Sequence, residues 1–328
     1  MSRPGRRLAA VLISAALAAC YRDPVPVTPV QPEPRSHPDR AALTSSDPLG
    51  FLPVESEVVA VIETRQLRAS AVWKRFEPAL MAKAGPMLVK FKAACGFDPL
   101  AALRRISLGI HHLDAPKPTG VVVLKGIDRT SAMACMDRAR AADPSRITVV
   151  RSDAGGDAVR EIVSIPGSDG DPPTVFTFVD AATLVFLIGP AASPAGLADV
   201  VRRGVPLRES PAFLDLLAHV EINDPLWFLF GGSSQAFDKA AMLGFKPRAI
   251  TCSLSLTNGL SAVARIRLDA PDQATQIAMM AQGQLQAVAS MVDEIGVSAD
   301  EADVVVRLRM TQEQVDSILG LFGGLLGP

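Results

Sequence analysis

Few residues in this chain of 328 are suited to metal binding or catalysis, since it contains only four histidines and four cysteines. Two of the histidines, His111 and His112, are adjacent on a predicted strand, where successive side chains point to opposite faces of the sheet. They are therefore not expected to chelate one metal ion together. No HExxH motif and no paired His/Cys spacing is present. The sequence predicts no metal site and no cofactor.

The nearest approach to a functional loop is the turn formed by Gly231, Gly232, Ser233 and Ser234, which precedes a predicted helix. A helix N-terminus approached by glycines can hold a phosphate or carboxylate. Alternatively, one of the two serines simply caps the helix. No P-loop lysine accompanies the turn, and no G-x-S-x-G motif occurs in the chain. The sequence therefore predicts a protein that is not an enzyme.

Three cysteines lie in the body of the protein, at positions 95, 135 and 252. In an oxidising compartment Cys95 and Cys135 can form a disulfide, because both lie on or at the end of helices expected to pack on the same unit. An odd number leaves at least one free thiol. The alternative is that all three are small buried apolar side chains. Because no CxxC is present, a thioredoxin-like activity is not indicated.

The overall composition excludes several classes of protein. The 33 basic and 34 acidic residues leave no basic surplus for binding to nucleic acid. Hydrophobic residues make up 48% of the chain, which is enough to bury a sizeable core and is unlike collagen or a disordered chain.

The N-terminus has the pattern of a secretory signal. Arg3, Arg6 and Arg7 form a positive region, and residues 8–19 form an uncharged, mostly apolar run. This run is shorter than the roughly 20 residues needed to span a bilayer. The segment is therefore expected to direct export and to be removed.

The end of this signal, Leu17-Ala18-Ala19-Cys20, resembles the lipobox of bacterial lipoprotein precursors. The resemblance implies that residues 1–19 are cleaved and that Cys20 receives diacylglycerol on its thiol and an acyl chain, such as palmitate, on its new amino group. It thus implies a membrane anchor, with the cell envelope as the location. Tyr21 replaces the aspartate that favours the inner membrane in enterobacterial lipoproteins, which favours the outer membrane, facing the periplasm or the cell surface. The alternative is an ordinary cleaved signal with a chance cysteine.

Residues 20–48 are expected to be a lipidated cysteine followed by a proline-rich tether. Seven prolines between residues 21 and 48 prevent regular helix or sheet. In a polyproline-like conformation this stretch reaches about 85 Å. It would hold a globular body off the membrane.

The body alternates predicted strands and helices, so its expected class is α+β. A helix is expected over residues 67–95, broken near Gly85-Pro86, and a long helix over residues 271–294. Residues 58–151 and 226–310 both read βαββαβ, the order of a ferredoxin-like unit. We therefore expect two such units joined by a segment rich in β-hairpins, with a boundary between residues 49–222 and 223–328. Residues 249–322 are similar in layout to uncharacterised exported bacterial α+β proteins, a resemblance that implies no activity.

Three functions are considered for this architecture. The first is a non-enzymatic, membrane-anchored envelope lipoprotein that binds a partner or has a structural role. The second is a carrier or sensor with an apolar pocket for a lipid or acyl ligand, because residues 121–124, 184–188 and 226–230 are strands apolar on both faces. The third is an envelope hydrolase without a recognisable motif. The membrane is the partner implied by the lipid, and the protein or lipid bound by the body is left open.

Overall fold

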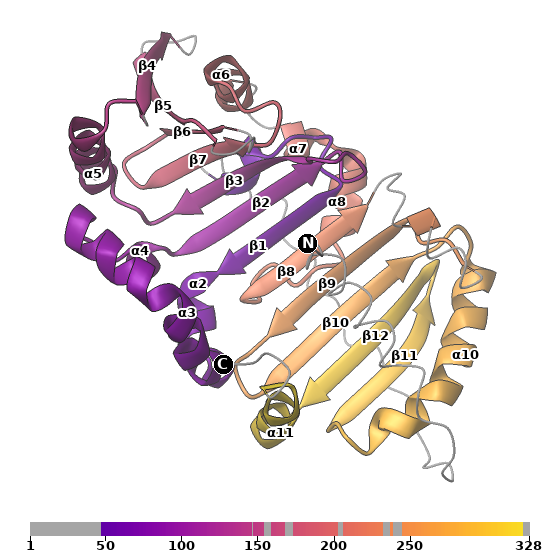
Figure 1. Cartoon of the computed structure of the whole chain (residues 1–328). Coiled ribbons are helices and arrows are strands. Elements are labelled where there is room, and N and C mark those ends of the chain that lie inside the picture. The colour runs from indigo at the N-terminus through magenta and orange to yellow at the C-terminus, as the bar shows by residue number, and fades with distance from the viewer. Residues whose placement is uncertain are drawn as a thin grey trace.

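The twelve strands within the described residues of the body lie in one antiparallel sheet. The computed structural model describes residues 47–145, 147–153, 159–167, 173–202, 206–231, 237–238 and 245–323. The strands follow the order β11-β12-β10-β9-β8-β1-β2-β3-β7-β6-β5-β4, and the helices lie on both faces and along the rim (Figure 1). The mixed α+β class expected from the sequence is confirmed. The expected signal peptide, Cys20 and nearly all of the tether lie outside the described residues.

Eleven of the strands occur close to where the hydrophobic pattern predicts them. The strands are β1 (Val58–Glu63), β2 (Arg105–His111), β3 (Thr119–Lys125), β4 (Thr148–Asp153), β5 (Val159–Ile165), β6 (Thr174–Phe178), β7 (Thr183–Ile188), β8 (Leu226–Gly231), β9 (Ala249–Ser255), β10 (Leu260–Arg267), β11 (Glu294–Asp300) and β12 (Asp303–Met310). The described helices are the short 3-10 helix η3 (Pro48–Phe51), α2 (Thr64–Ala69), α3 (Ala71–Cys95), α4 (Pro99–Ala102), α5 (Arg129–Ala142), α6 (Pro194–Arg202), α7 (Pro206–Glu209), α8 (Pro211–Leu217), α10 (Pro271–Ala289) and α11 (Gln312–Gly323).

The sheet is built from two halves that meet at the β1–β8 pair. In this antiparallel pair Val58 lies opposite Phe230 and Val61 lies opposite Trp227. From the pair outward, one half continues β2-β3-β7-β6 and the other continues β9-β10-β12-β11. The two halves therefore share one topology, and the first half adds the edge hairpin β4–β5.

The expectation of two ferredoxin-like units is wrong in its strand pairing. In a split βαβ unit the two strands joined by the first helix are parallel, with another strand between them. Here β1 and β2 are antiparallel neighbours, and so are β3 and β7. The expected boundary at residues 222 and 223 also does not separate two sheets, because β8 pairs directly with β1. Element order alone does not determine which strands pair.

The strand missing from the sequence analysis is β11. The helix expected up to residue 294 ends at Ala289, and β11 pairs with β12 through a two-residue connection that contains Glu301 at φ 53°. The apolar side chains of β11 alternate at Ile295, Val297 and Ala299. This alternation has the period of a strand, but it follows directly on a helical pattern, so the strand is hard to recognise in the sequence.

The helix caps and turns follow their sequence signals. Asp128 accepts a hydrogen bond from the Ser131 N–H at 2.8 Å and begins α5. Thr311 and Gln314 form the reciprocal capping box at the start of α11, with distances of 2.9 and 3.3 Å. The expected break near Gly85-Pro86 does not occur, since α3 continues through both Pro78 and Pro86.

Side chains of the two sheet faces enter different cores. On one face Val61, Val123 and Trp227 belong to the largest cluster, which is covered by η3, α6, α7 and α8. On the other face, one smaller cluster packs under α5 and another packs under α10. The strands 121–124 and 184–188 are apolar on both faces because each face has its own helical cover.

A disulfide joins Cys95 at the end of α3 to Cys135 in α5, which is the pair singled out from the sequence. Arg138 reinforces this link by donating to the carbonyl oxygens of Ala94 and Cys95 at 3.1 and 2.9 Å. Cys252 in β9 is a free, half-buried thiol. Burial raises its pKa, and the nearby carboxylate of Asp224 raises it further.

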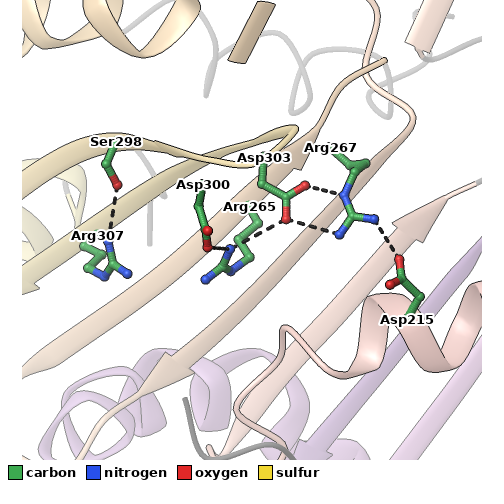
Figure 2. Close-up of polar contacts among 7 residues, drawn as sticks. All are labelled: Asp215, Arg265, Arg267, Ser298, Asp300, Asp303 and Arg307. Carbon is green, nitrogen blue, oxygen red and sulfur yellow. Dashed lines mark hydrogen bonds and ion pairs between the residues drawn. The ribbon is translucent and has the colours of Figure 1, made fainter. Parts of the chain in front are cut away.

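A buried ionic network links the second half of the sheet to the helical layer of the first (Figure 2). Asp303 on β12, only 3% exposed, is hydrogen-bonded by Arg267 and lies 3.6 Å from Nη1 of Arg265. Arg265 also donates to Asp300 at 2.8 Å, and Arg267 Nη1 donates to Asp215 of α8 at 2.7 Å. The hydrogen bond from Arg267 to Asp303 raises the pKa of that guanidinium. Each buried charge therefore has a partner of opposite sign.

Removing the central carboxylate of this network is expected to destabilise the fold. Asp303→Asn removes the carboxylate that Arg265 and Arg267 share and leaves them only the more exposed Asp300 and Asp215, so we expect a loss of about 3 kcal/mol in the free energy of unfolding. Urea denaturation measures this change in the free energy of unfolding. The matched control is Asp137→Asn on the exposed side of α5, which should change stability by less than about 0.5 kcal/mol. Equal stability of the two variants would show that the network contributes nothing.

Candidate functional site

A cavity of about 470 Å³ lies at the end of the sheet where β2 ends and β3 begins. This volume is within the range of sites that bind small molecules. Its walls come from the chain after η3, from β2, β3 and β7, and from α6 with the turn before it. The lining residues are Phe51, Pro53, Val54, Glu55, His111, His112, Thr119, Leu187, Ala191, Gly196, Asp199 and Val200.

The wall formed by residues 51–57 depends on Gly109 in β2. A Cβ at this position would lie 2.7 Å from Ser56 Oγ and 3.2 Å from Leu52 Cβ. Leu52 is fully buried against this part of the sheet. Glycine therefore lets the segment cross β2 closely enough to close one side of the cavity.

The two histidines lie together, contrary to the expectation that they point to opposite faces. The strand β2 ends at His111, and His112 has a left-handed backbone conformation with φ 58°. The alternation of side chains therefore stops between them. Their ring centroids are 4.5 Å apart with an angle of 59° between the planes, and both line the cavity.

A third ionisable group, Glu57, lies behind the cavity wall. Its N–H donates to the carbonyl oxygen of Ile110 at 2.8 Å, which continues the β1–β2 register and places Glu57 opposite His111. One carboxylate oxygen, Oε1, accepts from the Leu113 N–H at 3.2 Å. The other, Oε2, is buried, as is Nδ1 of His111, and neither has a hydrogen-bond partner within the described part of the chain. Buried polar atoms are normally paired. Others without a partner occur elsewhere in the described residues, such as Nε1 of Trp73 and Nε1 of Trp227, but Oε2 of Glu57 and Nδ1 of His111 are the ones that belong to a cavity residue or to its neighbour on the next strand.

The environment favours the uncharged form of His111. Burial is the main cause that lowers the pKa of His111, and the neighbouring His112 lowers it further. The carboxylates of Glu55 and Glu57 act in the opposite direction but do not reverse the shift. A neutral imidazole has one nitrogen that accepts a hydrogen bond and one that donates.

The lining of the cavity offers apolar surface, two imidazoles, two carboxylates and a hydroxyl. Thr119 contributes the hydroxyl among its lining residues, and these include no serine or cysteine. In the residue ranges that the structure describes, no group of three or more His, Cys, Asp and Glu side chains could hold a metal ion. The arrangement can therefore hold a ligand by apolar contact, hydrogen bonds and charge.

The described residues among the other sites considered from the sequence do not line this cavity. Gly231 is the last residue of β8, while Gly232, Ser233 and Ser234 lie outside the described residues, as does Cys20. The Cys95–Cys135 disulfide connects α3 and α5, neither of which lines the cavity. The cavity residues were missed because they come from five separate segments. The adjacent histidines were the signal in the sequence.

Comparison with protein-family models, with curated proteins and with known structures finds no match for this chain. No helix in the described ranges is both long and apolar enough to cross a membrane.

The lowered pKa of His111 predicts how stability varies with pH. As the pH falls below 6.5, the ordinary histidine value, the unfolded chain binds a proton before folded His111 does. The contribution of this group is therefore complete above pH 6.5 and is lost as the pH falls through the lower pKa of the folded state. In His111→Gln this loss should be absent, so the difference between the two stability curves isolates it. NMR titration of the His111 ring should give a pKa below 6.5, and a value at or above 6.5 would contradict the assignment.

Proposed function

We propose that this protein is a non-enzymatic, membrane-anchored lipoprotein of the cell envelope whose body binds a small ligand in the His111–His112 cavity. The cavity is the observation that supports ligand binding, because a protein with a purely structural role would not need one. Its volume and lining favour a carrier or sensor, for which an apolar pocket of several hundred Å³ is expected.

The apolar part of the ligand would contact Phe51, Leu187 and Val200, which come from three different segments. Burial of apolar surface there would supply affinity at about 25 cal/mol per Å². The polar lining residues are Glu55, His111, His112, Thr119 and Asp199. This mixture of polar and apolar lining suits an amphipathic molecule.

A hydrolase is less well supported by the same cavity. Acyl transfer needs a nucleophile hydrogen-bonded to its general base. The lining contains imidazoles and carboxylates, but its hydroxyl belongs to Thr119, which is 5% exposed. Binding without chemistry is therefore the function we propose.

The anchor part of the proposal rests on the Leu17-Ala18-Ala19-Cys20 pattern and on the prolines that follow it. Loss of residues 1–19 would leave 30 basic and 34 acidic side chains, a formal charge of −4, so attraction to anionic lipids would not hold the protein at a membrane. Acyl chains would, because each buried methylene contributes about 0.8 kcal/mol.

Metabolic labelling with palmitate tests the anchor. The wild-type protein should take up label and fractionate with membranes, because a thioether-linked lipid at Cys20 holds it there. Cys20→Ala should take up none, whereas Cys252→Ala, which removes the free thiol of β9, should be labelled like the wild type. A wild-type protein that retains residues 1–19 and carries no lipid would overturn this part.

Filling the cavity tests ligand binding. N-phenyl-1-naphthylamine, a neutral apolar dye that fluoresces when removed from water, should bind the purified wild-type protein. Val200→Trp places a large side chain in the cavity and should lower dye affinity at least about tenfold, since it removes most of the apolar contact. The control is Val89→Trp at an exposed position of α3, 69% accessible, which should leave binding unchanged. Equal binding by both variants would place the dye elsewhere and contradict the proposal.

A further inference from the structure

The polar side of the cavity is rich in hydrogen-bond acceptors. Oε2 of Glu57 and Nδ1 of His111 are buried without partners in the described part of the chain, and each would gain by meeting a donor. His111 lines the cavity, and its buried Nδ1 meets a ligand there once the ring rotates. With its proton on Nε2, the neutral ring accepts at Nδ1. The ligand is therefore expected to donate.

The charge around the cavity is negative. Glu55 and Asp199 line it, and Glu57 lies beside His111 on the neighbouring strand. The carboxylates of Glu55 and Glu57 both raise the pKa of His111. No lysine or arginine lines the cavity, and Arg202 pairs with the lining residue Asp199 at 2.8 Å. The acidic side chains that line the cavity are therefore not matched by a basic side chain in the lining.

The apolar part of the lining limits which kind of positively charged ligand the cavity can accept. Phe51, Leu187 and Val200 offer apolar contact and no hydrogen-bonding side chain. A small hydrated cation would leave this surface uncovered and would have to give up its own water. A charged head group attached to a hydrocarbon body matches both the acidic and the apolar residues of the lining.

We propose that the cavity selects small amphiphiles that carry a primary ammonium group, with Nδ1 of His111 accepting an ammonium N–H and with Glu55, Glu57 and Asp199 supplying the negative field. This inference rests on the proposed function and names its ligand class. A quaternary ammonium satisfies the charge but offers no N–H. A fatty acid brings a carboxylate into a negative field, and an alcohol donates but carries no charge.

Four ligands with the same eight-carbon chain separate these features: octylamine, octyltrimethylammonium, octanol and octanoate. Each is titrated against the purified protein at pH 7.5, where an alkylamine is protonated as lysine is. Displacement of N-phenyl-1-naphthylamine reports the affinity. Octylamine should bind most tightly and octanoate least, with at least about a tenfold difference between octylamine and octanol, the size expected for a charge-assisted hydrogen bond.

Variants locate the selectivity in the named residues. Glu57→Gln should weaken octylamine about tenfold and leave octanol unchanged, because it removes charge without changing shape. His111→Phe should reduce the affinity for octylamine to about that for octyltrimethylammonium, because the hydrogen-bond acceptor is lost while an aromatic ring is kept. Glu77→Gln, an exposed position on α3 outside the cavity, is the matched control and should change nothing.

The outcomes distinguish the two proposals. Octanol or octanoate binding as tightly as octylamine, with Val200→Trp still blocking all of them, would overturn the ammonium assignment and keep the binding function. Octyltrimethylammonium binding as tightly as octylamine would overturn the role of the N–H donors. Insensitivity of every ligand to Val200→Trp would overturn the binding function, and the inference with it.

Discussion

The hydrogen-bonded pairing of β1 with β8 is the constraint on which the rest of the structure depends. Each strand is the first of its half, and each would otherwise present a free edge of unpaired N–H and C=O groups. By pairing, they make one continuous sheet of the two halves and bring Val61 and Trp227 into a single core. The helices on both faces are then able to cover a surface that neither half could offer alone.

The functional asymmetry of the molecule follows from what is added to two halves of the same topology. In the first half, η3 and the residues after it cross the sheet at Gly109, and α6 returns over β7. These two additions enclose the cavity at the β2–β3 end. The corresponding face of the second half instead carries the arginines and aspartates of Figure 2. The same face of one sheet thus serves recognition at one end and cohesion at the other.

The two groups of buried charge differ in how completely they are satisfied. Asp303, Arg265 and Arg267 all have partners of opposite charge, as a network that holds strands and α8 together requires. Glu57 and His111 each retain an atom without a partner, at a cavity. An unsatisfied polar atom costs free energy in the folded state, and a ligand that supplies the missing donor recovers it. This contrast is the physical reason for placing function at the histidines and stability at the arginines.

The local structure of this protein can be predicted from short sequence patterns. Short runs of apolar and β-branched residues locate eleven strands, Asp128 and Thr311 mark helix starts, and composition identifies the proline-rich segment, because these signals act over a few neighbouring residues. Strand pairing, the Cys95–Cys135 bond and the cavity depend on residues far apart in the chain, so only the tertiary structure decided them. The histidines show the limit most clearly. Their adjacency was visible at once, but the left-handed backbone at His112 and the cavity that both rings line are features of the tertiary structure.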